Sequence, residues 1–129
     1  MPLIRIELPA ALPPDRWAAV IAEAVHDSMV ETIDVPPDDR FQLIASHAST
    51  ALVMDPHFPG QQRPAAPFII QITLRAGRGD AKKRALYAAI ERRLVQAGLP
   101  PNSAMVVLTE NGPADWSFSG GVAHYARAA

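Results

Sequence analysis

The first candidate for chemistry in this sequence is its second residue, Pro2, which follows Met1 and opens an apolar stretch. A proline lacks the backbone N–H that a strand uses in its hydrogen bonds, so it does not help a strand to begin. A proline at position 2 makes sense if Met1 is removed, because aminopeptidases cleave methionine before small residues and would leave Pro2 with a free secondary amine. The pKa of such an α-amine is roughly 7.7–8.0 in model peptides, and burial or nearby cations lower it. Pro2 could therefore serve as a base or a nucleophile, or it could be an incidental strand start.

Two arginines and one acid could complete a site around this amine. Arg75 and Arg78 lie in "LRAGRGD", and a guanidinium offers a planar set of donors that matches a carboxylate. They could also lower the pKa of the amine, or be solvated loop residues or intersubunit ion pairs. Asp39 in "PPDDR" could orient or deprotonate water, although this composition is typical of any solvated turn.

The four histidines do not predict a metal site. His47, His57 and His124 lack the spacing of metal ligands and have no acids in a matching pattern. His26 lies away from the apolar stripe of its predicted helix, so we expect a surface or interface histidine there. Trp116 and Phe118 are aromatic residues of a type that more often belongs to a core than to the wall of a ligand site.

The composition excludes several classes of protein. A net charge of -1 gives no general attraction to nucleic acid or to acidic membranes. The absence of cysteine excludes disulfides, thiolate zinc sites and cysteine nucleophiles. No apolar run has the roughly 18–20 residues of a membrane span, and Arg5 and Glu7 interrupt the early apolar stretch where a signal peptide would need one. A soluble cytoplasmic protein is therefore expected.

Strands and helices must position the candidate residues, and the hydrophobic pattern predicts both. The first half is expected to contain a strand at 2–8, a helix from Pro14 or Asp15, and strand at 41–46 and again at 51–55. A proline-rich loop at 56–67 follows. The second half is expected to contain a buried strand from Phe68, a helix capped by Gly79 or Asp80, a strand at 103–110 and a glycine-containing loop at 111–121. This order makes two βαβ units, each with parallel strands and a right-handed crossover.

The predicted fold class is α/β, an α+β sandwich of one four-stranded sheet with both helices on one face. We expect each unit to start at the same end of the sheet, and an oligomer to cover the open face. The 129 residues suggest a single domain. It divides into a βαβ unit at about 2–54, a loop at about 55–67, a second unit at about 68–110 and a loop and tail at 111–129.

Four segments together resemble the tautomerase superfamily, and within it the malonate semialdehyde decarboxylase group. They are "MPLI", "VPPDDRFQLI", "LRAGRGDAKKRALYAAI" and "ENGPADWSFSGG", and the resemblance covers nearly the whole chain. It implies the fold shared with macrophage migration inhibitory factor, a homotrimer with sites between subunits, removal of the initiator methionine, no cofactor and a small carboxylic acid as substrate.

The resemblance also assigns roles to residues of this sequence. Pro2 matches the catalytic proline, and Asp39 matches the acid that handles water in the decarboxylases. Arg75 and Arg78 match the arginines that bind the substrate carboxylate. Trp116 and Phe118, in "DWSF", match part of a hydrophobic wall around the site.

Some positions depart from the decarboxylase pattern, whose arginines lie two apart. Arg75 and Arg78 lie three apart, which resembles the cis-3-chloroacrylic acid dehalogenase group. That group also uses a histidine on the first helix, which makes His26 a possible site residue. Its acidic and tyrosine partners have no clear counterpart here. Gly79 stands where relatives often have serine, which weakens the cap of the second helix.

The expected function is decarboxylation of a small 3-oxo acid such as malonate semialdehyde, with a hydratase side activity. Two alternatives within the superfamily are a keto–enol tautomerase of the phenylpyruvate type and a dehalogenase-like hydrolase. An alternative from another class is a non-catalytic binding or scaffold relative, in which Pro2 is a relic. The protonation state of Pro2 helps to decide between these reactions.

Overall fold

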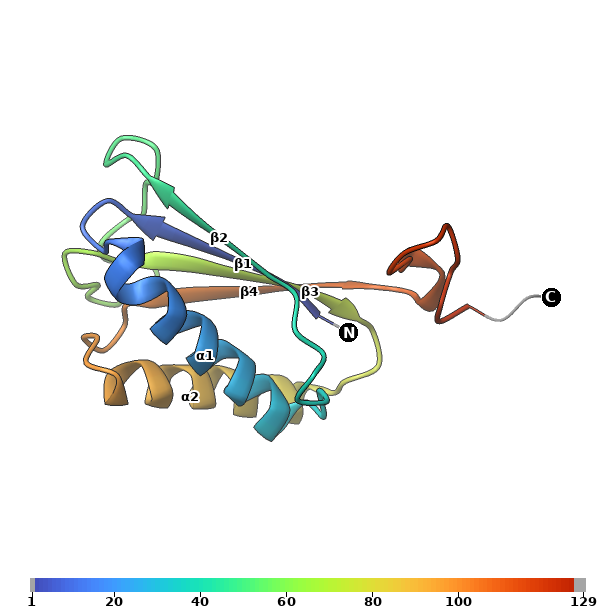
Figure 1. Ribbon diagram of the computed structural model, residues 1–129. Helices are drawn as coiled ribbons and strands as arrows, with labels where there is room; N and C mark the ends of the chain where they lie inside the picture. Colours follow the sequence, from blue (N-terminus) through green and yellow to red (C-terminus); the bar gives the residue numbers. More distant parts are fainter. Residues whose placement is uncertain (1, 127–129) are drawn as a thin grey trace.

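The computed structural model describes residues 2–126 and contains one four-stranded sheet with two helices packed on one of its faces (Figure 1). The elements in chain order are β1 (Pro2–Pro9), α1 (Pro14–Thr32), β2 (Gln42–His47), β3 (Phe68–Arg75), α2 (Asp80–Gln96), β4 (Ala104–Asn111) and a short 3-10 helix, η1 (Pro113–Asp115). This architecture confirms the predicted fold class of two βαβ units that share one sheet.

The strand order is β2-β1-β3-β4, with β1 parallel to β2 and β3 parallel to β4. The two central strands, β1 and β3, are antiparallel, and Pro2 is paired with Leu74. The expectation that both units start at the same end of the sheet is therefore wrong. The second unit runs in the opposite direction, so the start of β1 lies beside the end of β3.

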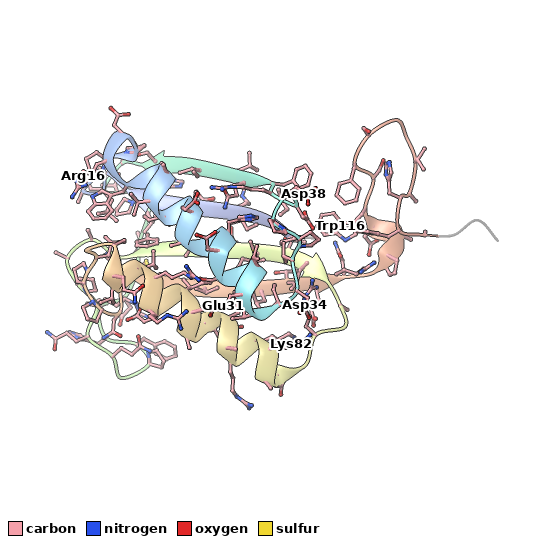
Figure 2. All side chains as sticks on the ribbon, turned by 60° about the horizontal axis from the view of Figure 1, so that its bottom comes forward. Arg16, Glu31, Asp34, Asp38, Lys82 and Trp116 are labelled. Carbon is pink, nitrogen blue, oxygen red and sulfur yellow. The ribbon has the colours of Figure 1, made fainter. Side chains whose placement is uncertain are left out.

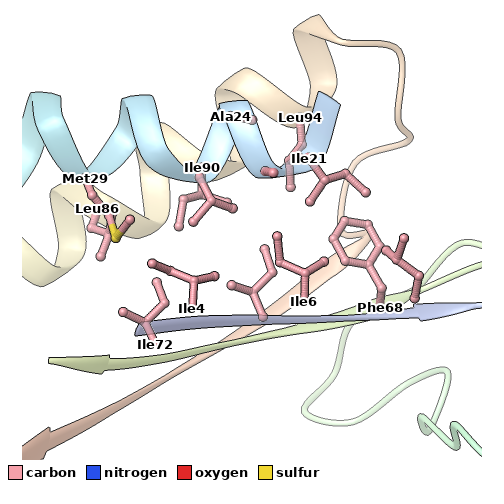
Figure 3. Packing of buried hydrophobic residues seen from close by; sticks show 14 of the residues in the cluster. Ile4, Ile6, Ile21, Ala24, Met29, Phe68, Ile72, Leu86, Ile90 and Leu94 are labelled. Carbon is pink, nitrogen blue, oxygen red and sulfur yellow. The ribbon is translucent and has the colours of Figure 1, made fainter. Parts of the chain in front are cut away.

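The core lies between the sheet and the helices, as the alternation in the strands predicts. Ile4 and Ile6 of β1 and Ile72 of β3 are fully or almost fully buried and point toward α1 and α2 (Figure 3). Ile21 and Met29 on α1 meet them from the helix layer. At about 1.5–3 kcal/mol for each large apolar side chain removed from water, this layer holds the ends of the strands in fixed positions.

The second half of the first predicted unit differs from expectation. No strand forms over residues 51–55, and β2 ends at His47. The reason is that β1 ends at Pro9, which is paired with His47, so a longer β2 would have no partner strand. The predicted proline-rich loop at 56–67 contains turns but no helix or strand.

The face of the sheet away from the helices is partly apolar. Leu43 of β2 is 51% exposed, and Met105 and Val107 of β4 are 38% and 39% exposed. Such a face normally requires a partner to cover it. Among the described residues, no helix is long and apolar enough to cross a membrane.

Candidate active site

Pro2 and the end of β3 form one side of a cluster at the end of the sheet where β1 begins. Pro2 is buried and is the first residue of β1. Because Pro2 is paired with Leu74, the next and last residue of β3, Arg75, lies close to the start of β1. The antiparallel arrangement of β1 and β3 thus brings together Pro2 and an arginine that is far from it in the sequence.

Arg75 is half-buried and is flanked by the C-terminal part of the chain. It is paired with Asn111, the last residue of β4. The guanidinium carbon of Arg75 lies 4.4 Å from the ring centroid of Tyr125, which is a favourable cation–π distance. This contact limits the orientations available to the guanidinium.

Arg78 is held by two backbone carbonyls. Its Nε donates to the carbonyl of Ile33 at 2.9 Å, and its Nη1 donates to the carbonyl of Arg75 at 3.1 Å. Gly77, which has a φ of 133°, allows the tight loop between the two arginines. Arg78 therefore ties the C-terminal end of α1 to the end of β3, while its remaining N–H groups are available to a ligand.

Asp39 lies at the end of the turn between α1 and β2, and only 9% of its surface is exposed. Its backbone N–H donates to the carbonyl of Pro36 at 3.0 Å. Burial raises the pKa of the Asp39 carboxyl, and the charge of Asp38 adds to this, whereas the amino terminus, His26 and Arg78 lower it. The carboxyl of Asp39 thus interacts electrostatically with α1, through His26, and with the loop after β3, through Arg78.

The raised pKa of Asp39 predicts opposite effects on stability and activity. An acid whose pKa is higher in the folded state stabilises the fold at low pH, and this contribution is lost as the pH rises through the folded pKa. We therefore expect Asp39→Asn to raise the Tm at pH 7, with a gain that vanishes below about pH 4, near the usual pKa of aspartate. Loss of a group that handles protons should lower turnover by roughly 100-fold or more.

The check is a thermal melt at several pH values together with an activity assay, and Asp38→Asn is the matched control. Asp38 lies on the same turn but is exposed, so its removal should leave turnover nearly unchanged. A variant Asp39→Asn that is fully active, or less stable than the wild type at pH 7, would contradict this prediction.

Aromatic side chains from the C-terminal segment lie at the same end of the molecule. The rings of Trp116 and Phe118 are stacked with centroids 5.9 Å apart, and Phe118 lies 5.8 Å from Phe41, which precedes β2. The indole Nε1 of Trp116 donates to Oδ1 of Asn111 at 2.7 Å. Figure 2 shows Trp116 and Asp38 at one end of the molecule and Arg16 at the other.

Tyr125 is a candidate site residue that the sequence analysis missed. Its ring contacts Phe118 edge-on with centroids 5.4 Å apart, and its other contact is with Arg75. Burial raises the pKa of the Tyr125 hydroxyl, and Asp39 adds to this increase. The sequence shows only that the C-terminal tail contains a tyrosine. The fold is needed to show that the tail returns to Arg75 and brings this tyrosine to the site.

His26 was expected at a surface or an interface, and this expectation is wrong for the described chain. The residue is 5% exposed, and its Nε2 lies 2.8 Å from the carbonyl oxygen of Pro37. The cause is that the turn after α1 folds back along the helix and covers the face that carries His26. His26 therefore adjoins the turn of Asp39.

Within residues 2–126, no group of three or more histidine, aspartate or glutamate side chains has the arrangement of a metal site. His47 is instead paired with Glu7, with Nε2 and Oε2 2.5 Å apart, on the sheet face opposite the helices. The cluster at the start of β1 thus contains a proline, two guanidinium groups, a carboxyl and aromatic rings, and its guanidinium groups suit a small anionic substrate.

Comparison with known proteins decides the family. Residues 2–62 and residues 39–119 match two family models, each described as "Tautomerase enzyme". The probable tautomerase YusQ of Bacillus subtilis (strain 168) is 32% identical over 94% of this chain and 95% of its own length. This chain belongs to the tautomerase family. YrdN, another probable tautomerase of the same organism, is 28% identical over 97% of this chain and 96% of its own length.

Solved structures of malonate semialdehyde decarboxylases are similar to this chain. The FG41 malonate semialdehyde decarboxylase, inhibited by 3-bromopropiolate, matches with a TM-score of 0.87 and 36% identity over 95% of this chain and 93% of that one. Another malonate semialdehyde decarboxylase, studied for its decarboxylase and hydratase activities, has a TM-score of 0.86 and 27% identity, covering 95% of each chain. The predicted resemblance is confirmed, and the chain is a tautomerase-family enzyme.

Proposed function

We propose that this tautomerase-family enzyme decarboxylates a small 3-oxo acid, such as malonate semialdehyde, with Pro2 as its key group after removal of Met1. The observation that supports the proposal is the pairing of Pro2 with Leu74, the residue directly before Arg75. The similarity to the FG41 malonate semialdehyde decarboxylase supports the choice of substrate.

In the proposed mechanism, Arg75 and Arg78 bind the substrate carboxylate by charge-assisted hydrogen bonds. A cationic Pro2 donates a hydrogen bond to the 3-oxo oxygen, where negative charge develops. The bond between the carboxylate carbon and C2 breaks, and its electron pair forms the enolate as CO2 leaves. A solvent proton then reaches C2 through a water that Asp39 orients, which gives the aldehyde, and no cofactor takes part.

The same residues would support hydration of an activated unsaturated acid. Asp39 would take a proton from water as the water adds to the alkene or alkyne. Arg75 would hold the acid, and the stacked rings of Trp116 and Phe118 would exclude bulk water from one side of the substrate. We place this activity second, as a side reaction of the same site.

A keto–enol tautomerase is the second candidate, because both Bacillus subtilis relatives are called probable tautomerases. In that reaction a neutral Pro2 moves a proton between an enol oxygen and carbon. An amine with a pKa below the working pH favours tautomerisation, whereas a cationic amine favours decarboxylation. A dehalogenase-like hydrolase remains an alternative because of the spacing of Arg75 and Arg78.

The test begins with the intact mass of untagged protein, which shows whether Met1 is removed. The processed protein is then assayed with malonate semialdehyde, by following acetaldehyde formation, and with phenylenolpyruvate, by following loss of the enol absorbance. A kcat/KM for malonate semialdehyde well above that for the enol supports the first proposal. The reverse order supports the tautomerase, and absence of turnover of every 3-oxo acid would sink the decarboxylase assignment.

We also propose that the enzyme is a cytoplasmic homotrimer whose subunits cover the apolar open faces of their sheets. Leu43, Met105 and Val107 supply the exposed apolar surface, and a fused 4-OT of the same fold forms a symmetric trimer. Light scattering during gel filtration should give about three times the 13.9 kDa of one chain. Leu43→Glu should shift the mass toward the monomer, and a monomeric wild type would rule out the trimer.

A further inference from the structure

His26 is a buried polar residue that the proposed mechanism does not use. It lies on α1, and its side-chain hydrogen bond within the described part of the chain joins Nε2 to the carbonyl oxygen of Pro37, at 2.8 Å. A carbonyl can only accept, so Nε2 must carry the proton. A neutral ring satisfies this contact, and it leaves Nδ1 as an acceptor that is buried with no hydrogen-bond partner among residues 2–126.

The turn that His26 contacts offers few backbone donors to the neighbouring helix. Pro36 and Pro37 have no backbone N–H, so neither can donate to the neighbouring helix. The hydrogen bond from the N–H of Asp39 to Pro36 lies within the turn itself. The bond from His26 therefore joins the turn to α1 one residue before Asp38 and two residues before Asp39.

Other bonds hold the chain on either side of the turn. Before it, the N–H of Val35 donates to the carbonyl of Met29 at 3.5 Å, and after it the N–H of Ile4 donates to the carbonyl of Phe41 at 3.0 Å. Arg40 and Glu23 form an exposed ion pair, with Nη1 and Oε2 3.1 Å apart, which contributes little in water. The side-chain amide of Gln42 donates to the carbonyl of Ala22 at 2.9 Å, at the start of β2. The His26 bond is thus the side-chain hydrogen bond from α1 that reaches the turn itself.

We propose that His26 is a positioning residue that fixes the Pro36–Asp39 turn through its Nε2–H and so holds the Asp39 carboxyl in place. Its part in catalysis rests on the proposed function. Its part in placing Asp39 rests on the hydrogen bond and on the burial of both residues.

The placement has an electrostatic consequence that can be measured without substrate. Burial is the main cause of the raised pKa of Asp39. The charged groups that act on it are Asp38 on its own turn, His26 on α1, Arg78 after β3 and the amino terminus, and it acts in turn on Tyr125 of the tail. If the turn is released, water reaches Asp39 and its pKa should fall toward the usual value for aspartate.

The matched variants are His26→Gln and His26→Asn, which differ by one methylene. The amide nitrogen of glutamine reaches about as far as Nε2 of histidine and can donate to Pro37, whereas that of asparagine is too short. Both variants remove the charge that His26 can carry, so this effect cancels between them. His26→Met, an apolar side chain of similar length, replaces His26→Asn if the latter does not fold.

The measurements are a carbon-13 NMR titration of the Asp39 carboxyl and the kcat, KM and pH profile of turnover. His26→Gln should keep the raised titration midpoint of Asp39 and a kcat within about threefold of wild type. His26→Asn should lower the midpoint and reduce kcat roughly 10- to 100-fold, since misplacement of a group by about 1 Å can cost that much. The KM should change little in either variant.

Two results would overturn the proposal. The first is an Asp39 titration that is the same in His26→Asn and His26→Gln, which would mean that the bond does not hold the turn. The second is an equal rise of KM in both variants with kcat retained, which would mean that His26 binds substrate directly. An inactive wild type would count against the proposed function alone, because the NMR comparison would still decide the role of His26.

Discussion

Protein that carries an uncleaved N-terminal extension is expected to lose turnover by roughly 10²- to 10⁴-fold, the contribution typical of a positioned acid–base group. In such protein the nitrogen of Pro2 is part of a tertiary amide, so it has neither a basic lone pair nor an N–H to donate. The fold should persist, because β1 is anchored by the buried side chains of Ile4, Ile6 and Leu8 rather than by its first residue.

The matched control is the same protein with the tag at its C-terminus, in which aminopeptidase can remove Met1. Intact masses establish the state of each terminus, and kcat/KM is compared at several pH values. Equal trimer mass and equal Tm show that only the amine has changed. Full activity in the extended protein would exclude Pro2 from the mechanism and would favour a site built from the arginines alone.

Substitutions of the two arginines are expected to differ in their effects. Arg75 should matter only for ligand binding, whereas Arg78 should matter for ligand binding and for the stability of the fold. Removal of a guanidinium from a buried hydrogen-bonded charge pair costs about 2–5 kcal/mol. Arg75→Ala should therefore lower kcat/KM by about 30-fold to several thousand-fold. Its Tm should hardly change, since its guanidinium contacts the ring of Tyr125 rather than the core.

Arg78→Ala should lower both kcat/KM and Tm, because it also removes the hydrogen bonds to the carbonyls of Ile33 and Arg75. In this half-buried setting, the loss of each hydrogen bond from the charged guanidinium lowers the free energy of unfolding by no more than about 1.5–3 kcal/mol. Arg84→Ala, on the exposed face of α2, is the control for a lost positive charge. Unchanged Tm in Arg78→Ala would show that its backbone contacts are dispensable, and unchanged kcat/KM in Arg75→Ala would remove its role at the carboxylate.

Much of the fold could be predicted because local patterns agree with it. The alternation around Ile4 and Ile6 gives β1, and the apolar run from Phe68 gives β3. Pro14 begins α1, and Gly98, with a φ of 105°, follows the end of α2. These signals depend on neighbouring residues alone, so they can be read without knowledge of the tertiary structure.

The features that were wrong or missed depend on contacts between distant segments. The direction of β3 relative to β1 depends on how the loop after His47 crosses the sheet. Whether residues 51–55 form a strand depends on the point at which β1 ends. His26 is buried by a turn that returns to its helix, and Tyr125 reaches Arg75 only because the tail folds back. The residues that match family motifs, by contrast, could be named from the sequence.

The antiparallel centre of the sheet limits how many reactive sites one molecule can have. The two βαβ halves are arranged as if rotated by half a turn about an axis between β1 and β3, and these strands share the same pattern of buried positions. Phe68 therefore occupies in the second half the place that Pro2 has in the first. Its nitrogen belongs to a peptide bond and donates to the carbonyl of Ser103 at 2.9 Å. After removal of Met1, a duplicated architecture would thus carry a single proline amine, and a reagent selective for this secondary amine should label each polypeptide once.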